Sequence, residues 1–191
     1  PAPPPERRAL PGISLRGRDL QVIVKLASIV LSPSKPSYPG GTWHVEGMRD
    51  EAIVATAIYY LANDNVADTR LRFRQSVSEP TYEQDDRSGV ECAYGLVDQE
   101  PLVQDLGHVT TPARRALAWP NSLQHRVEPF ELLDKTREGR RQMLVFFLVD
   151  PNVRVTSTAD VAPQQASWLQ MELRMMPLFR KLPAECLQRI T

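Results

Sequence analysis

The sequence has no excess of charge of either sign. Its 23 lysines and arginines are balanced by 23 aspartates and glutamates, so the formal net charge is zero. Proteins that bind nucleic acids or anionic membrane surfaces do so through many unbalanced cations. We therefore expect neither a nucleic acid nor a membrane as partner, and instead a small molecule or a protein as substrate.

Cysteines and long hydrophobic runs are also scarce. The two cysteines, Cys92 and Cys186, do not form a CxxC pair, and no charged-then-apolar signal segment opens the chain. This favours an intracellular compartment, cytoplasmic or nuclear. No apolar run approaches the ~20 residues that a membrane-spanning helix needs, so we expect a soluble protein. The length of 191 residues and the apolar content of 42% suit a single packed domain.

The two ends of the chain differ from its middle. Residues 1–18 are rich in proline and arginine without an apolar period, which predicts a disordered tail or linker. Residues 161–191 are predicted to be a helical segment. Because the chain starts with proline rather than methionine and stops soon after residues 182–190 begin a second helix, we expect both ends to be cut from a longer protein.

The helical segment carries several local signals. Ser167 and Gln170 have the spacing of a capping box, and Pro177 is expected to bend or divide the helix. Apolar side chains recur at helical spacing along it. These are Trp168, Met171, Met175 and Phe179.

Residues 19–160 are predicted to form one mainly β domain. Short runs of β-favouring residues recur between turn-rich connectors such as 32–41 and 134–139. Many short strands of this kind are typical of a sandwich, a barrel or a jelly roll. The expected strands are 20–27, 53–61, 71–75, 90–95, 115–119, 125–130, 142–149 and 153–157.

Three residues offer a set of metal ligands. His44 and Glu46 are two apart, so their side chains share one face if the segment is extended. His125 follows an apolar run that would bring it into the interior from another strand. Two imidazoles and one carboxylate, with open positions left over, form the ligand set of non-haem Fe(II) oxygenases. We predict His44, Glu46 and His125 as metal ligands and catalytic centre, although zinc also accepts this set; His108 is interpreted as a loop histidine.

The His-x-Glu is followed along the chain by the AIYYL run at 57–61, the WPN turn at 119–121 that precedes His125, and an arginine ahead of the run QMLVFF. These motifs carry a resemblance, between residues 20 and 149, to the prolyl-hydroxylase-like 2-oxoglutarate and Fe(II)-dependent dioxygenases. It implies a double-stranded β-helix, that is, a cupin-like jelly roll, with a C-terminal helix. It also implies Fe(II), 2-oxoglutarate and O₂, with Tyr60 and Arg141 binding the distal carboxylate of 2-oxoglutarate.

Longer strings resemble a narrower family. PGGTWHVEGM at 39–48, YEQDD at 82–86 and FLVDPN at 147–152 are similar to the largely fungal domain of unknown function 4246. The resemblance to this family implies a fold and a cofactor, but it does not indicate a substrate.

The proposed clamp also makes physical sense apart from the resemblance. An arginine can bind a carboxylate through two parallel hydrogen bonds, and a tyrosine hydroxyl can add a third. The sequence departs from the dioxygenase pattern in two ways: Glu46 replaces an aspartate, and a longer gap after His125 leaves Arg140 as an alternative to Arg141. Alternation along a strand lets only one of the two enter the pocket. Lys25 is a weaker candidate for the same pocket.

The expected activity is oxidation of an unknown substrate, of the hydroxylase type, with succinate and CO₂ as coproducts. Residues Arg70, Arg72 and Arg74 and the acidic loop 83–86 are candidate substrate contacts, or else ordinary surface. The alternatives are a jelly-roll interaction module that has lost turnover, and a zinc protein that uses the same ligands.

Overall fold

The computed structural model describes residues 12–162, 164–183 and 185–186. Its contacts divide the chain into two compact units, the first ending at Val153 and the second starting at Arg154. Most of the predicted tail and most of the predicted last helix lie outside the described residues. Within the described part, no helix combines the length and the hydrophobicity that a membrane crossing needs.

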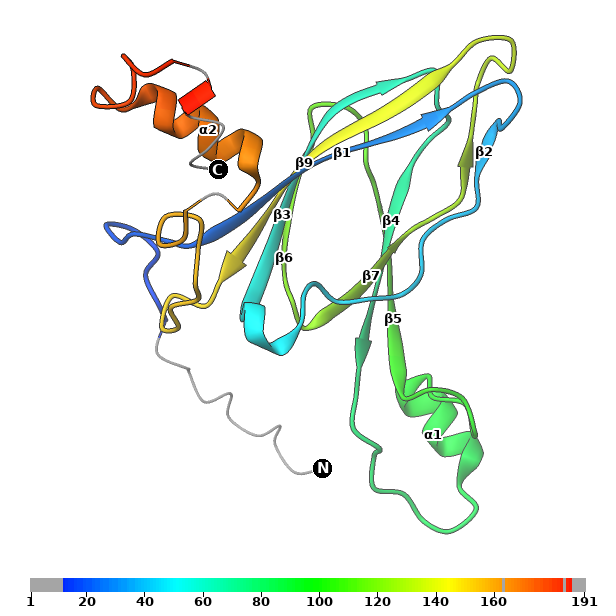
Figure 1. Ribbon diagram of the computed structural model, residues 1–191. Helices are drawn as coiled ribbons and strands as arrows, with labels where there is room; N and C mark the ends of the chain where they lie inside the picture. The colour runs from blue at the N-terminus through cyan, green and yellow to red at the C-terminus, as the bar shows by residue number, and fades with distance from the viewer. Residues whose placement is uncertain (1–11, 163, 184, 187–191) are drawn as a thin grey trace. The chain divides into compact units, whose positions relative to one another are not determined.

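The first unit is built from antiparallel strands (Figure 1). One sheet has the order β1-β9-β3-β6, a second has the order β5-β4-β7, and β2 pairs with β8. The predicted mainly β, jelly-roll fold with a C-terminal helix is confirmed. The strands are β1 (Val22–Leu31), β2 (Ser37–Tyr38), β3 (Ile53–Asp64), β4 (Arg70–Ser76), β5 (Val103–Thr110), β6 (Ala116–Pro120), β7 (Leu123–Val127), β8 (Phe130–Glu131) and β9 (Gly139–Val149).

Strand β9 lies between β1 and β3 and shows why the sequence forms this sheet. Its odd-numbered residues from Gly139 to Val149 are buried, while the even-numbered ones are exposed or half-buried. Period-two alternation sends these two sets to opposite faces. Met143, Val145 and Phe147 pack with Tyr60 of β3 into one core cluster. The buried face of β9 therefore carries both the core and the polar residue Arg141.

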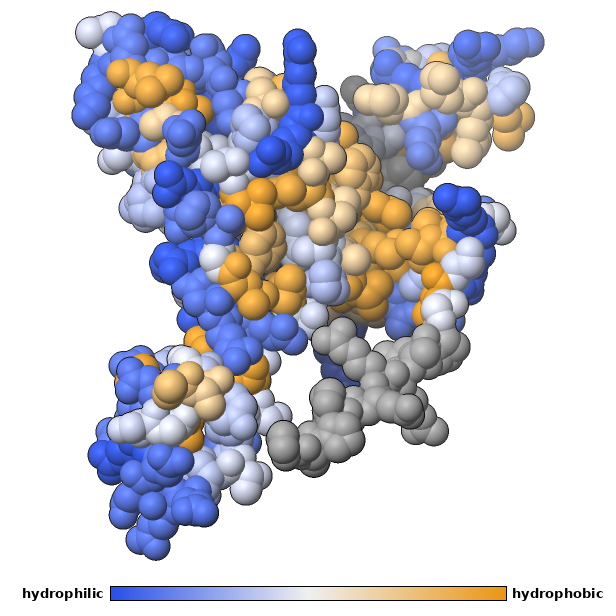
Figure 2. All heavy atoms as spheres, turned by 180° about the vertical axis from the view of Figure 1, so that it is seen from behind, coloured by the Kyte–Doolittle hydropathy of each residue, from blue (hydrophilic) through white to orange (hydrophobic). Residues whose placement is uncertain are grey.

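The opposite face of this sheet is also apolar. The β1 side chains of Val24, Leu26 and Val30 are 60%, 69% and 59% exposed, and Phe146 of β9 pairs with Val24. Figure 2 shows hydrophobic side chains gathered in the middle of one side of the molecule. Apolar residues on both faces explain why β1 and β9 are near-continuous hydrophobic runs in the sequence.

The inserted turn between β8 and β9 is held in place by one asparagine. Asn65 Nδ2 donates to the carbonyl oxygens of Asp134, Arg137 and Glu138, and Asn65 Oδ1 accepts from the Asp134 amide at 2.8 Å. The next residue of the sheet, Gly139, lies so close to Asn65 that a Cβ there would meet its carbonyl oxygen. This bracing fixes where β9 begins, and hence the depth of Arg141.

Three local predictions were wrong. Residues 90–95 belong to helix α1 (Arg87–Tyr94) instead of a strand, because Asp86 caps the helix N-terminus by accepting from the Gly89 amide and Gly95 ends it with φ of 66°. Residues 153–157 form no strand. Helix α2 (Ala166–Met175) begins after Gln165 without a side-chain cap, so the Ser167 capping box is absent. It ends before Pro177, as the proline requires.

Candidate metal centre

A short antiparallel bridge brings the two histidines together. The His44 amide donates to the His125 carbonyl at 3.2 Å, and the His125 amide donates to the His44 carbonyl at 3.0 Å. Their imidazole centroids are 4.4 Å apart. Because β7 carries His125 and the bridge adds the His44 segment beside it, residues far apart in the sequence share one face of the sheet.

Glu46 completes the cluster from the same extended segment. Its Oε1 lies 3.1 Å from His125 Nε2 and 3.6 Å from His44 Nε2. The ligand atoms of all three residues lie within 4.8 Å of one another. The hydrogen bond from His125 is the main cause that holds the pKa of Glu46 below its ordinary value of 4.5, so the group is a carboxylate at neutral pH. The three side chains that the sequence singled out are therefore brought together.

The His44 imidazole is oriented as a metal ligand requires, whereas His125 Nε2 contacts Glu46 and its buried Nδ1 has no hydrogen-bond partner among the described residues. His44 Nδ1 lies 2.8 Å from the Thr42 carbonyl oxygen, which can only accept, so Nδ1 carries the proton and Nε2 keeps its lone pair. The His125 ring is buried and packs edge-on against Trp119, with centroids 4.9 Å apart. The His44 side chain is 46% exposed and that of His125 is 4% exposed, so the cluster opens to solvent on the His44 side. The donor set and its convergence fit an iron or zinc ion.

Trp43 anchors the ligand-bearing segment from its other face. The guanidinium carbons of Arg74 and Arg126 lie 4.5 Å and 4.7 Å from the centre of its indole ring. Cations at this distance from an aromatic ring are attracted by its electron-rich face. Since neighbouring residues of an extended segment point to opposite sides, holding Trp43 against the two arginines places His44 on the side of Glu46 and His125.

Asn121 fixes the backbone on both sides of Glu46. Its Oδ1 accepts from the Glu46 amide at 2.8 Å, and its Nδ2 donates to the carbonyl oxygens of Glu46 and Ile53 at 2.8 Å and 2.9 Å. One carboxamide thus ties the Glu46 segment to the turn between β6 and β7. The sequence placed Asn121 in a matching turn, but nothing in the chain alone showed that it would contact Glu46.

Tyr60 and Arg141 form a second cluster on the buried face of the four-stranded sheet. Both residues are 0% exposed, and the Arg141 guanidinium carbon lies 4.8 Å from the centre of the Tyr60 ring. Burial lowers the pKa of Arg141 and raises the pKa of Tyr60 from its ordinary value of 10.0. Of the two arginines that the sequence offered, Arg140 is exposed and Arg141 is the one that lies beside Tyr60.

The Tyr60 and Arg141 cluster contains hydrogen-bond donors that lack acceptors within the described chain. Among the described residues, the Tyr60 hydroxyl, Arg141 Nε and Arg141 Nη1 make no hydrogen bond of good geometry, although the Tyr60 hydroxyl lies close enough to Arg141 and Thr111 for these neighbours to lower its pKa against the effect of burial. No carboxylate of the described chain pairs with Arg141. A buried cation without an anionic partner is costly, because its charge has been taken out of water. Three orphaned polar atoms around one guanidinium have the chemistry of an anion site.

A family model described as Protein of unknown function (DUF4246) matches residues 8–172 of the sequence. The chain belongs to this family. A search of curated proteins found no match to the sequence of this chain.

Two solved structures are similar in part to this DUF4246 protein. The first is the selenomethionine-labelled Fe(II)/(alpha)ketoglutarate-dependent dioxygenase TqaL, at 20% identity and a TM-score of 0.40, covering 78% of this chain and 49% of that one. The DUF4246 chain thus spans about half the length of the TqaL chain. The second is hydroquinone 1,2-dioxygenase PnpCD in complex with Cd²⁺ and 4-hydroxybenzonitrile, at 14% identity and a TM-score of 0.33, covering 78% and 69%.

The other candidate residues have ordinary surroundings. Lys25 and His108 are exposed, the latter on β5 rather than in a loop. Arg72 pairs with Asp105 and Glu128, and Arg74 donates to Gln124 as well as stacking on Trp43. Within the acidic loop, Asp86 is the cap of α1. Arg72, Arg74 and Asp86 therefore have structural explanations, whereas the charge of Lys25 contributes to lowering the pKa of Glu46 and thus acts on the triad.

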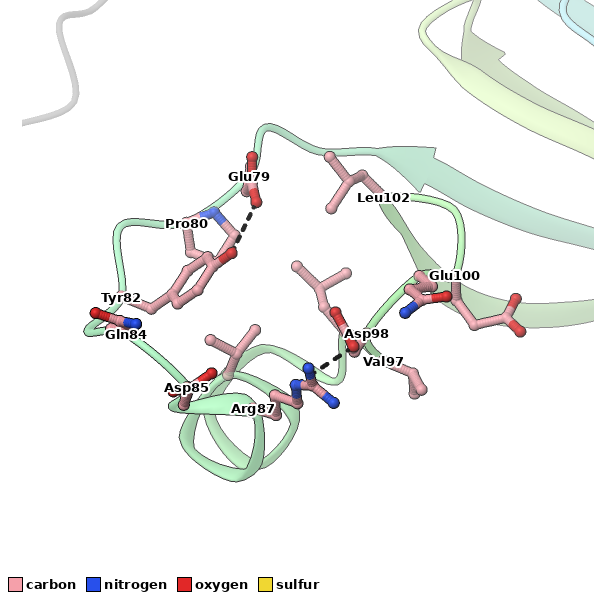
Figure 3. Close-up of a pocket in the computed structure, with 13 residues that line it drawn as sticks. Glu79, Pro80, Tyr82, Gln84, Asp85, Arg87, Val97, Asp98, Glu100 and Leu102 are labelled. Carbon is pink, nitrogen blue, oxygen red and sulfur yellow. Dashed lines mark hydrogen bonds and ion pairs between the residues drawn. The ribbon is translucent and has the colours of Figure 1, made fainter.

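A cavity of about 470 Å³ lies in the long connection between β4 and β5 that carries α1 (Figure 3). Carboxylates and apolar side chains share its lining, with Glu79 accepting from the Tyr82 hydroxyl and Arg87 paired with Asp98. None of the triad residues lines it. The cavity is thus separate from the metal centre.

Proposed function

We propose that this DUF4246 protein is an Fe(II)- and 2-oxoglutarate-dependent dioxygenase that oxidises an organic substrate. The observation that carries the proposal is the buried Arg141, which has two unpaired nitrogens beside the unpaired Tyr60 hydroxyl. A hydrolytic zinc centre has no use for a second, buried anion site. A cosubstrate with a carboxylate at its far end does.

His44, Glu46 and His125 would hold the iron. Three protein ligands leave open positions at an octahedral ion, which suit a chelating 2-oxo acid and O₂. When bound, the iron and 2-oxoglutarate supply the oxidising chemistry, in which one oxygen atom of O₂ enters succinate, with release of CO₂, and the other enters the substrate. The carboxylate state of Glu46 and the free Nε2 of His44 prepare the ligands before the metal arrives.

Tyr60 and Arg141 would bind the distal carboxylate. Their hydrogen-bond donors are already desolvated, so they would pay little further cost when the anion replaces the missing partner. Trp119 and Phe73, whose rings meet edge-on at 5.3 Å beside His125, cover the apolar side of the centre and keep water from it. The open side at His44 is where a substrate would approach.

The test is an anaerobic titration of the purified protein with Fe(II) and 2-oxoglutarate. A visible charge-transfer band is expected, and it should disappear in His44→Ala and in His125→Ala while circular dichroism stays unchanged. His108→Ala is the matched control, because His108 is an exposed histidine on β5 and should leave the band intact.

Absence of the band in folded wild-type protein at millimolar 2-oxoglutarate would overturn the proposal. If zinc then raised the melting temperature in a His44-dependent manner, the centre would be a zinc site. If no metal did so, the fold would serve as an interaction module.

A further inference from the structure

Thr111, which follows β5, contacts the proposed cosubstrate clamp. Its side chain is 0% exposed, and Arg141 Nη2 lies 3.1 Å from its Oγ1. A guanidinium can only donate hydrogen bonds, so the Thr111 hydroxyl must accept here. Of the three guanidinium nitrogens, Nη2 is therefore the one held by the protein, and Nε and Nη1 are left free.

The Arg141–Thr111 hydrogen bond is connected to further hydrogen bonds of Thr111 with Thr69 and Asn63. With Thr111 Oγ1 accepting from Arg141, its own proton is available to Thr69 Oγ1, 2.7 Å away. The Thr69 hydroxyl then donates to the Thr111 carbonyl oxygen at 3.1 Å. Asn63 Nδ2 donates to the same carbonyl oxygen at 2.8 Å. Asn63 Nδ2 also lies 3.4 Å from Thr69 Oγ1, so the three side chains form one connected network behind Arg141.

We propose that Thr111 is a positioning residue, which holds Arg141 so that its free N–H groups face the carboxylate of a bound dicarboxylic acid. The inference rests on the proposed function and adds a residue that no pattern along the chain distinguishes. Thr69 and Asn63 fix Thr111 in turn, because they occupy its hydroxyl proton and its carbonyl oxygen. Thr69 is 3% exposed, and Asn63, Thr69 and Thr111 contribute to the lining of a cavity of about 420 Å³.

The burial of the network makes its effect on binding large. A hydrogen bond to a charged group is stronger than one between neutral groups, and removing one partner leaves the other desolvated. Thr111→Val keeps the side-chain shape but removes the acceptor, so Arg141 would be free to turn toward other partners. We expect 2-oxoglutarate to bind about tenfold more weakly or worse.

The first experiment is an anaerobic titration of the Fe(II) protein with 2-oxoglutarate, read from the charge-transfer band. Thr111→Val should shift the half-saturation point by that factor, and Thr111→Ser, which keeps the hydroxyl, should restore it. Pyruvate has the same 2-oxo acid end but no distal carboxylate, so Thr111→Val should leave its weak binding unchanged. A merely structural role would weaken both ligands alike.

The neighbouring residue, Thr110, provides a matched control. Thr110 is exposed, and its Oγ1 accepts from Arg115 at 3.0 Å, so Thr110→Val removes the same kind of bond from a surface arginine. It should bind 2-oxoglutarate as the wild type does. Thr69→Val tests the network from its far end and should weaken binding by a smaller factor; it stands in for Thr111→Val if that variant does not fold.

A second experiment does not depend on iron. Glutarate has the carboxylates without the keto group, and it should raise the melting temperature of the metal-free wild type more than that of Thr111→Val. If the band is absent but glutarate still protects in a Thr111-dependent manner, the dioxygenase proposal fails and the role of Thr111 stands. If the folded Thr111 and Thr69 variants bind both ligands as tightly as the wild type, or if glutarate and 2-oxoglutarate bind to none of the proteins, the inference is overturned.

Discussion

At the residue scale, Arg141 has a charge that no carboxylate of the described chain balances. Burying an unpaired charge costs stability, and apolar replacements of buried charges are often neutral or stabilising. We therefore expect Arg141→Met to keep or raise the melting temperature while it abolishes 2-oxoglutarate binding. Such a combination would mark a residue retained for function rather than for folding.

Arg140→Met is the control for this prediction, because Arg140 is the exposed neighbour on the same strand. It should change neither the melting temperature nor the binding. Calorimetry and the charge-transfer titration measure the two properties separately. A melting temperature lowered by ten degrees or more in Arg141→Met would show that the arginine is instead part of the structural core.

The raised pKa of Tyr60 predicts how the stability of the protein changes at alkaline pH. Burial raises its pKa in the folded protein above the ordinary 10.0, whereas the unfolded chain titrates at the ordinary value. Stability is therefore constant below about pH 10 and is lost as the pH rises through the folded pKa, since only the unfolded state readily releases this proton. In melting curves from pH 8 to 11, Tyr60→Phe should lose less stability than the wild type. Parallel curves would contradict the prediction.

Asn121 is expected to control metal affinity without touching the metal. Asn121→Ala removes three hydrogen bonds that fix Glu46 and its neighbours. Loss of groups that orient a metal ligand typically lowers affinity by about 10–100-fold. Equilibrium dialysis with Fe(II) measures the effect, and Asn152→Ala, in the exposed turn after β9, is the control. Unchanged Fe(II) affinity would show that the backbone bridge between His44 and His125 positions the metal ligands without Asn121.

These residues also show what the sequence could and could not predict. His44, Glu46, His125, Tyr60 and Arg141 have recognisable neighbours along the chain, and the structure does bring them together in two clusters. Asn121 and Thr111 have roles that exist only through contacts between distant strands. No local pattern encodes such contacts, because they depend on strand register.

At the element scale, each wrong prediction has its own physical cause. Residues 90–95 alternate in a way that predicts a strand, but the signals that decide are Asp86 before and Gly95 after them, which cap a helix. Residues 153–157 are β-favouring, yet no strand pairs with them in the described chain, and a strand needs a neighbour for its hydrogen bonds. Long alternating segments such as β3 and β9 were predicted well because burial reinforces their period.

Strand β1 allows a test of which face is the core. Leu31 is 2% exposed, whereas Leu26 on the other face is 69% exposed. Leu31→Ala should lower the free energy of unfolding by about 2–5 kcal/mol, since it leaves a cavity among Val66, Phe130 and Leu132. Leu26→Ala should change it by less than about 0.5 kcal/mol. Urea denaturation measures both, and equal losses would mean that the face bearing Leu26 is covered in the native protein.

At the scale of the whole molecule, the site depends on two sheets being brought together. His125 and Phe73 come from the three-stranded sheet and Trp119 from the four-stranded one, and their rings pack together. Hydrophobic patterning predicted that such sheets exist. Which strand lies beside which follows from long-range pairing, such as β1 with β9. The resemblance to a family implied a jelly roll, but no strand order was predicted from the chain.

The division of the chain into two units leads to a last prediction. Every residue of the triad and of the clamp lies in the unit that ends at Val153. A fragment ending at Val153 should therefore unfold in one cooperative transition and keep the iron charge-transfer band with 2-oxoglutarate. A fragment ending at Asp160 is the control for the predicted boundary at residue 160, because it adds the Arg154–Asp160 ion pair of the second unit. If only the full chain gives the band, residues beyond 160 contribute to the site; if the longer fragment gives it and the shorter does not, the functional domain ends after the ion pair.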